Sequence, residues 1–173
     1  MPRLRDVLPE HPRLLLVGIN PGLRSGAIGH HFAGRGNPFW RLIHAAGLVP
    51  SLLSPEEDQH LGAHGIALTN LCPRTTRTAA ELTPAERARG ARVLARKIRR
   101  LRPAVVAFLG LGLYQDFFGH KSSGGAGPKP ETIAGAAVFV LPNPSGLNAA
   151  FPGFADKLRW FRALRVYLRR MKS

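Results

Sequence analysis

The chain is poor in cysteine and in long hydrophobic runs, and each shortage excludes a class of protein. Cys72 is the single cysteine among 173 residues, so disulfide bonds and cysteine-bound iron–sulfur clusters are excluded. No apolar stretch approaches the ~20 residues that span a bilayer, and residues 1–6 lack the apolar core of a signal peptide. We therefore expect a cytoplasmic protein without membrane attachment, in which Cys72 is a small buried residue at the end of a strand.

Acidic residues are also scarce. The sequence holds 10 Asp and Glu against 25 Lys and Arg, which gives a formal net charge of +15 and an isoelectric point near 11.6. A surface this basic favours a polyanionic partner, and nucleic acid is the commonest one. An arginine-rich genome would raise the number of arginines, but it does not explain why acids are so few. The composition therefore predicts a nucleic-acid-binding protein, and we expect it to act at the bacterial nucleoid.

Strand-like and helix-like stretches alternate along the chain, with no internal repeat and no linker that would divide it. The predicted strands are Leu14–Ile19, Ile66–Leu71, Ala104–Leu109 and Ala137–Leu141. The predicted helices are Phe39–Ala46, Pro84–Leu101, Leu111–Phe118 and Phe154–Arg170, and residues 119–135 are predicted to form a mobile loop. We expect one α/β domain over residues 1–173, a three-layer doubly wound sandwich around a central four-stranded parallel sheet.

Two short motifs follow directly on apolar runs. The first is Gly-Ile-Asn-Pro-Gly at 18–22, and the second is Asn-Pro-Ser-Gly-Leu-Asn at 143–148. A turn rich in proline and glycine after a buried strand lies at the carboxyl end of that strand, where an open α/β sheet binds its ligand. Neither motif contains an acid or a histidine. Chemistry at this edge must therefore rely on amide groups, unless the fold brings a distant carboxylate close.

These motifs closely resemble those of the mismatch-specific uracil-DNA glycosylases, the branch of the uracil-DNA glycosylase superfamily that includes the thymine-DNA glycosylases. The resemblance covers nearly the whole chain. The segments similar to the family's first active-site block are 18–23 (GINPGL), 32–33 (FA) and 37–40 (NPFW), and 141–147 (LPNPSGL) is similar to its second. Segments 65–71 and 74–76 are similar to its middle strand and the loop that follows.

The resemblance implies hydrolysis of the bond between uracil and deoxyribose in mismatched double-stranded DNA, which initiates base-excision repair. The most active branch of the superfamily has an aspartate in the first motif, where this chain has Asn20. The resemblance gives Asn20 the role of holding the attacking water through its side-chain carbonyl. An amide cannot accept the proton outright, so we expect slow turnover that depends on positioning. On local sequence alone, Asn20 is also explained as an Asx-turn residue before Pro21.

The resemblance also assigns residues to the extruded base. Phe32 stacks on the base, and the region of Ile19 contacts its edge. Backbone N–H groups of the first turn and the amide of Asn143 stabilise the departing uracil anion. Ser25 takes the place of a small residue near the pyrimidine 5-position, where it would influence whether thymine fits. The alternative for Phe32 is a loop aromatic that covers the core.

A third set of residues is assigned to the DNA outside the base pocket. Gly146, Leu147 and Asn148 are similar to the family's intercalating wedge, with Leu147 entering the base stack; the alternative is a leucine buried under its own loop. An arginine that can follow the wedge in the family is Ala149 here, so we expect the chain to accept uracil outside a G mismatch. The residues expected at the DNA backbone are Arg24, Arg74, Lys121 and Ser122.

No metal or cofactor is expected. His30 and His31 are adjacent and have no neighbouring acid or thiolate in the sequence, and the glycines after the first strand form neither a dinucleotide-binding fingerprint nor a P-loop. Neither motif contains a lysine, so no lyase activity is indicated. We therefore predict a monomeric, cofactor-free, monofunctional DNA glycosylase. Two alternatives stay open: a non-catalytic α/β DNA-binding module, and a nucleotide hydrolase that requires Mg²⁺.

Overall fold

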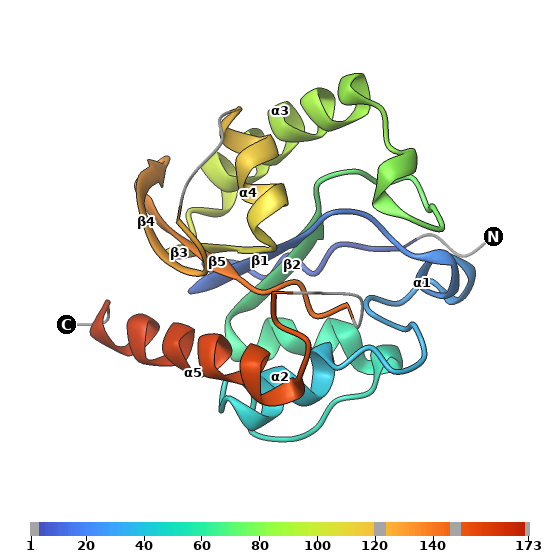
Figure 1. The fold of residues 1–173 in the computed structure, drawn as a ribbon. Helices are drawn as coiled ribbons and strands as arrows, with labels where there is room; N and C mark the ends of the chain where they lie inside the picture. Colours follow the sequence, from blue (N-terminus) through green and yellow to red (C-terminus); the bar gives the residue numbers. More distant parts are fainter. Residues whose placement is uncertain (1–3, 120–123, 146–149, 172–173) are drawn as a thin grey trace.

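A five-stranded sheet forms the middle layer of the molecule (Figure 1). The computed structural model describes residues 4–119, 124–145 and 150–171 of the chain. The strands lie in the order β2-β1-β3-β5-β4. Their bounds are β1 (Leu14–Gly18), β2 (Ile66–Asn70), β3 (Val105–Leu109), β4 (Gly127–Ile133) and β5 (Ala136–Leu141).

Four of these strands are the parallel strands that the sequence predicts. β1 pairs in parallel with β2 and β3, and β3 pairs in parallel with β5. Every residue of β1 and of β3 is buried. A parallel strand covered on both faces has no solvent side, which explains why these segments appear in the sequence as continuous apolar runs.

The prediction of a four-stranded sheet is wrong, because β4 pairs with β5 in the antiparallel direction at one edge. This strand lies inside the segment 119–135 that the sequence predicts to be a loop. Its sequence, Gly-Pro-Lys-Pro-Glu-Thr-Ile, lacks the apolar alternation of a strand, and such a composition is tolerated at a sheet edge. The hairpin to β5 turns at Ala134 and Gly135, whose φ angles of +50° and +87° suit a two-residue turn.

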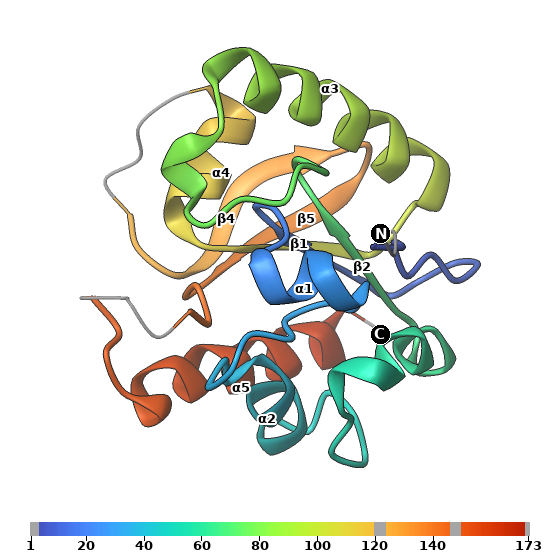
Figure 2. The same ribbon diagram turned by 90° about the vertical axis from the view of Figure 1, so that its right-hand side faces the viewer.

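Helices cover both faces of the sheet, which confirms the three-layer sandwich (Figures 1 and 2). One face carries α3 (Pro84–Leu101) and α4 (Leu111–Phe118), and the other carries α2 (Phe39–Ala45) and α5 (Phe154–Arg170). Alternate residues of β1 enter the two cores, Leu14 and Leu16 on the α2/α5 side and Leu15 and Val17 on the α3/α4 side. None of the helices among the described residues is long and apolar enough to cross a membrane.

Three short elements are absent from the sequence prediction: α1 (Leu23–Ile28) and the 3₁₀ helices η1 (Pro55–His64) and η2 (Ala79–Glu81). α1 packs close to the segment after β2, because a Cβ on Gly26 would lie 2.2 Å from Thr75 Oγ1. A side chain at position 26 would therefore force Thr75 to move. Cys72 is buried just after β2, as predicted, and burial raises the pKa of its thiol.

The order of the strands predicts a ligand site next to β1. This strand has β2 on one side and β3 on the other, so the chain reverses its direction across the sheet there. Open α/β sheets bind ligands at the carboxyl ends of the strands beside this reversal. The outer edge of β2 is covered by Val7, which exchanges two backbone hydrogen bonds with Leu68, of 2.8 and 2.9 Å.

Candidate functional site

A pocket of about 450 Å³ opens at the carboxyl edge of the sheet. Its lining includes residues 18–25 after β1, Asn70 at the end of β2, and residues 76–79. The predicted catalytic and base-binding residues therefore meet in one place, together with Arg24. They are Ile19, Asn20, Ser25, Phe32 and Asn143. We call this cavity the Asn20 pocket.

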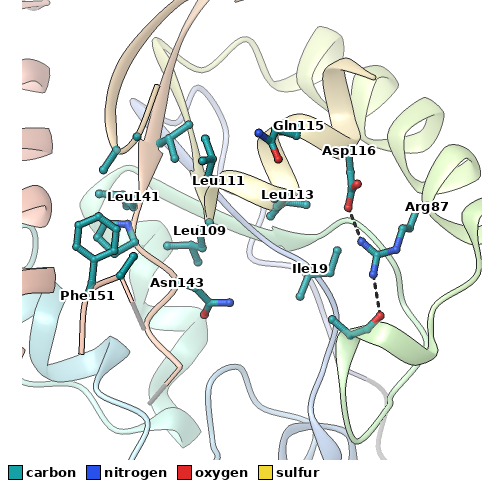
Figure 3. Close-up of a pocket in the computed structure, with 18 residues that line it drawn as sticks. Ile19, Arg87, Leu109, Leu111, Leu113, Gln115, Asp116, Leu141, Asn143 and Phe151 are labelled. Carbon is teal, nitrogen blue, oxygen red and sulfur yellow. Dashed lines mark hydrogen bonds and ion pairs between the residues drawn. The ribbon is translucent and has the colours of Figure 1, made fainter. Parts of the chain in front are cut away.

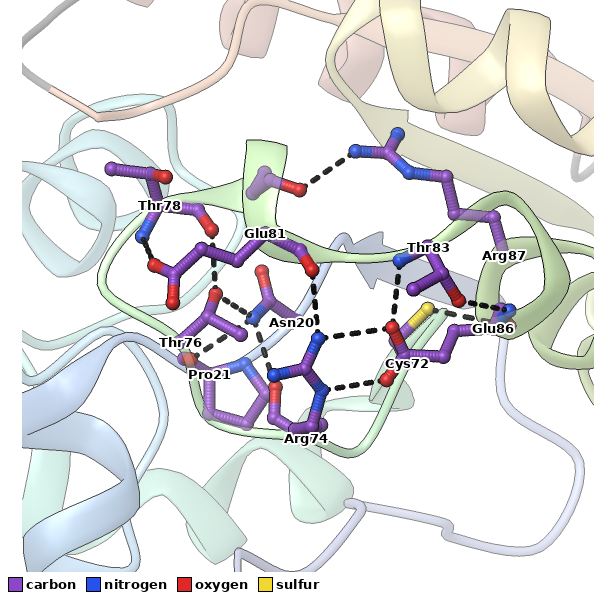
Figure 4. Close-up of polar contacts among 11 residues, drawn as sticks. Asn20, Pro21, Cys72, Arg74, Thr76, Thr78, Glu81, Thr83, Glu86 and Arg87 are labelled. Atoms are coloured by element: carbon purple, nitrogen blue, oxygen red, sulfur yellow. Dashed lines mark hydrogen bonds and ion pairs between the residues drawn. The ribbon is translucent and has the colours of Figure 1, made fainter.

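The amide nitrogen of Asn20 is held by acceptors from two segments (Figure 4). It donates to Thr76 Oγ1 over 2.7 Å and to the Arg74 carbonyl over 2.9 Å, with a longer contact of 3.3 Å to the Pro21 carbonyl. Thr76 Oγ1 itself donates to the Thr78 carbonyl over 2.8 Å, so it is an acceptor toward Asn20. Carbonyl oxygens cannot donate, and this fixes which end of the Asn20 amide faces them.

The oxygen end of Asn20 is consequently turned away from these partners, as Figure 4 shows. Within the described residues no hydrogen bond to Asn20 Oδ1 is formed, and Asn20 lines the pocket. A fixed carbonyl acceptor at a pocket wall can orient one water molecule without itself taking a proton.

An ion pair fixes the segment that holds Asn20. The Arg74 guanidinium donates to both carboxylate oxygens of Glu86, over 2.6 and 3.0 Å, and to the Glu81 carbonyl over 2.8 Å. Glu86 also accepts the N–H of Thr83 at the start of α3. These hydrogen bonds, first the one from Arg74, lower the pKa of Glu86 to about 2. A phosphate contact by Arg74 would have to displace Glu86, and it stays a prediction.

Phe32 reaches the pocket from an unusual backbone conformation. Its φ of +51° lies in the left-handed region, which is uncommon for a residue that carries a Cβ. Its ring stacks on Phe39 at the start of α2, with the ring centroids 4.0 Å apart and an angle of 22° between the planes. A ring anchored in this way in a pocket wall provides a flat surface on which a planar base can stack.

Side chains from three elements hold the backbone on both sides of Phe32. The buried Asp58 in η1 accepts the N–H of His31 over 3.0 Å. Trp40 Nε1 donates to the carbonyl of His31 over 3.1 Å, and Ser25 Oγ accepts the N–H that follows Phe32 over 3.0 Å. Since a loop offers these groups no sheet or helix partner, side chains must satisfy them. We call these three contacts the Phe32 clamp.

The adjacent histidines, His30 and His31, make further contacts around the Phe32 clamp. His31 is buried, its Nε2 lies 2.7 Å from the Arg5 carbonyl oxygen, and burial lowers its pKa below the usual 6.5. His30 Nδ1 lies 3.4 Å from Asp58 Oδ1. Across residues 4–119, 124–145 and 150–171 there is no group of three or more His, Cys, Asp and Glu side chains that could hold a metal ion.

Gly18, at the end of β1, makes room for two side chains of the pocket. A Cβ at this position would lie 2.7 Å from Asn70 Oδ1 and 3.5 Å from Phe32 Cζ. Gly18 pairs with Asn70 across the parallel strands β1 and β2. Asn70 therefore occupies the pocket wall because its neighbour on β1 has no side chain.

A second cavity, of about 600 Å³, lies beside the Asn20 pocket, and Ile19, Leu109 and Asn143 line both (Figure 3). An ion pair between Arg87 of α3 and Asp116 of α4 borders it. Asn143 Oδ1 accepts the N–H of Ser145 over 2.9 Å. The acceptor end of the Asn143 side chain is therefore used within its own turn.

Five of the predicted residues cannot be placed in the site. Gly146, Leu147 and Asn148 of the wedge, and Lys121 and Ser122 at the DNA backbone, lie outside the described residues, so their roles stay predictions. Arg24 is exposed, lines the pocket, and forms no ion pair with another described residue. Its position suits the predicted phosphate contact.

Three residues of the site were missed by the sequence analysis: Asn70, Thr76 and Asp58. Asn70 could have been found, since it is a polar residue that ends a predicted strand at the same edge as Asn20. Asp58 was missed because it contacts His31 from 27 positions away in sequence, with no pattern linking them. Thr76 lies in the segment 74–76 that resembles the family's loop, but that resemblance gave it no role.

Two comparisons with known proteins bear on this site. Residues 5–168 match a family model described as the uracil DNA glycosylase superfamily. The chain is also similar to the solution NMR structure of a protein from Methanosarcina acetivorans, which is provisionally described as a uracil DNA glycosylase. The TM-score is 0.60 at 17% sequence identity, over 99% of this chain and 98% of that one. At this identity the structural likeness establishes a shared fold alone.

Proposed function

Because the chain belongs to the uracil DNA glycosylase superfamily, we propose that it hydrolyses the N-glycosidic bond of uracil in mismatched double-stranded DNA. Thymine and other modified pyrimidines are further candidate substrates. The protein acts as a monomer, and its product is an abasic site with both DNA strands intact. This reaction would initiate base-excision repair.

The orientation of Asn20 is the observation that carries the proposal. Cleavage gives the sugar oxocarbenium character, and water must approach it from the side opposite the departing base. Asn20 would hold this water through Oδ1, because Thr76 and the Arg74 carbonyl fix its nitrogen. Positioning of this kind can supply several kcal/mol of the barrier reduction, of order 7–11 in the best cases.

The remaining pocket residues would hold the base and receive its charge. Phe32 stacks on the extruded base, and Ile19 contacts its edge. The Asn143 side chain would donate to the uracil anion as it leaves, since its oxygen is engaged with Ser145. A preoriented donor aimed at developing charge contributes typically 10²–10³ in rate.

Hydrolysis without strand cleavage agrees with the composition of the pocket. A glycosylase that also cleaves the strand uses an amine as nucleophile. Among the described residues, no lysine lines the Asn20 pocket. Leu147 would fill the place of the flipped base, and Ala149 would leave the choice of the opposite base relaxed, so that uracil opposite adenine is also a substrate.

The test is a single-turnover incubation with a labelled duplex that carries one uracil opposite guanine, in excess EDTA, followed by alkaline cleavage of abasic sites. We expect strand scission only after alkali. Asn20→Ala should abolish it while the affinity for DNA stays close to that of the wild type. Gln59→Ala, which removes an exposed amide outside the pocket, is the matched control and should behave as the wild type.

Two outcomes would contradict the proposal. Tight DNA binding without scission at uracil, thymine or ethenocytosine opposite guanine would favour the non-catalytic DNA-binding module. Activity that requires Mg²⁺ and is lost in EDTA would favour a nucleotide hydrolase.

A further inference from the structure

α3 carries a row of arginines that the proposed reaction does not use. Each of them lies three or four residues from another member, which places all of them on one side of the helix. The opposite side of α3 is buried against the sheet through Gly90, Leu94 and Ile98. Every side chain of this row is exposed. We call it the arginine stripe, and its members are Arg89, Arg92, Arg96, Arg99 and Arg100.

The stripe has no acidic partner within the described part of the chain. Basic residues of α3 that face the protein are paired: Arg87 with Asp116, and Lys97 Nζ with Asp6 Oδ2 over 2.6 Å. The single acid of the helix, Glu86, is held by Arg74. Like charges three and four residues apart destabilise a helix. Repulsion among the arginines of the row therefore destabilises α3, and a bound polyanion would reduce this repulsion.

The stripe leads away from the Asn20 pocket. α3 begins close to residues 76–79, which line the pocket at the carboxyl ends of the strands. It ends just before the start of β3, at the amino ends of the strands. Its 18 residues correspond to a length of about 27 Å. Figures 1 and 2 show α3 along one flank of the sheet.

The arginines of α5 do not form an equivalent surface. Arg159, Arg162, Arg169 and Arg170 are exposed on that helix, but Val166, which is 47% exposed, interrupts the row. The Arg159 guanidinium lies 5.3 Å from the centre of the Trp160 ring, so it forms a cation–π contact within the helix. The uninterrupted row is therefore on α3.

We propose that the arginine stripe binds a second segment of double-stranded DNA, separate from the segment whose base enters the Asn20 pocket. The stripe extends over about 16 Å, a length along which duplex DNA carries roughly ten phosphates. Guanidinium groups bind phosphate without regard to sequence. DNA whose base enters the pocket would have to cover the carboxyl ends of the strands, and the stripe runs away from those ends along α3. We infer that one straight duplex does not serve both.

Two DNA sites on one protein would allow transfer between segments during the search for uracil. The inference rests on the proposed function only for the identity of the polyanion. It requires no chemistry at the Asn20 pocket.

The test uses two duplexes of one to two helical turns each, about 10–20 base pairs, with different fluorescent labels. One carries an abasic-site analogue and the other is unmodified. The full-length protein should bring both labels into one complex that contains a single protein molecule, measured by two-colour coincidence and by mass. The variant R92Q/R96Q/R99Q should lose the coincidence and keep the wild-type affinity for the abasic duplex. Its binding to the unmodified duplex should also depend less on salt, with a slope smaller by about 0.9 per lost phosphate contact.

The matched control is R159Q/R162Q/R169Q, which removes three positive charges from α5 and should keep the coincidence. Equal loss in the two variants would mean that overall charge alone matters, and it would overturn the proposal. A wild-type protein that never joins two duplexes would also overturn it. In that case, weaker binding of the α3 variant to one long duplex would mean that a single DNA molecule bends along α3. Base release from a single short duplex is measured separately, so a protein that joins two duplexes but releases no uracil would contradict the proposed function and not this inference.

Discussion

Asn20 and Asn143 are the same kind of residue in the same kind of turn, yet the structure uses their side chains in opposite ways. Asn20 is anchored through its nitrogen by a segment more than 50 residues away. Asn143 is anchored through its oxygen by a residue of its own turn. The Asn20 oxygen is therefore turned away from its partners, whereas the Asn143 oxygen is engaged within its own turn. Under the proposed function, the first side chain would accept from a water molecule and the second would donate to the departing anion.

The comparison predicts that removal of either side chain lowers the rate of uracil release, but by a different factor. Asn20→Ala should lower the single-turnover rate of uracil release by about 10³ or more, because the water loses the oriented acceptor Asn20 Oδ1. Asn143→Ala should lower it by about 10²–10³, the range for one lost donor to a developing anion. Both rates are measured on the uracil–guanine duplex with DNA affinity as the control. Equal losses in rate and in affinity for either variant would contradict these roles.

The anchoring of Asn20 can be weakened without touching Asn20. Thr76→Val keeps the shape of the buried side chain and removes the nearer acceptor, so the amide should lose its fixed orientation. We expect a fall of about tenfold in the single-turnover rate, corresponding to ~1.4 kcal/mol. Thr132→Val, at an exposed threonine of β4 outside the pocket, should leave the rate unchanged. An unchanged rate for Thr76→Val would mean that the Arg74 carbonyl suffices to hold the amide.

The Phe32 clamp should affect binding of the base more than the chemical step. Asp58→Ala leaves the buried N–H of His31 without an acceptor, which we expect to destabilise the fold by about 1–3 kcal/mol. The substrate concentration for half-maximal rate should rise severalfold, with a smaller change in the maximal rate. Asp58→Asn keeps an oxygen acceptor and should restore most of the loss. A fall in maximal rate alone would place Asp58 outside the support of Phe32.

The smallest expected effect concerns the pH dependence of stability. Burial lowers the pKa of His31 in the folded protein, so the unfolded chain binds more protons just below the usual pKa of 6.5. Stability from this group is complete above about pH 6.5 and decreases as the pH falls toward the folded pKa. Melting temperatures measured across this range should show the slope, and His31→Gln should reduce it. Gln59→Ala, which removes an exposed side chain without an ionisable group, should leave the slope unchanged.

The sequence predicted the four parallel strands and the two turns, because buried strands and proline–glycine turns are local signals. It also predicted α3, whose start is fixed by Thr83, Pro84 and Glu86. β4 was missed because Pro128 and Pro130 are typical of a loop, although an edge strand tolerates them. The anchoring of Asn20 and the Phe32 clamp were missed for another reason, since each joins residues that only the folded chain brings together. Local chemistry was visible in the sequence, and the contacts that orient it were not.

The two edges of the sheet have a consequence for how the protein behaves at high concentration. An open strand edge invites strands of other molecules to add to it, and aggregation can follow. Here one edge is β4, where two prolines lack N–H groups and the register is irregular between Lys129 and Thr132. The other edge is β2, where Val7 already occupies hydrogen-bonding positions of Leu68. Both edge strands of the sheet are thus poor templates for strand addition, which disfavours aggregation through the sheet edges at high protein concentration.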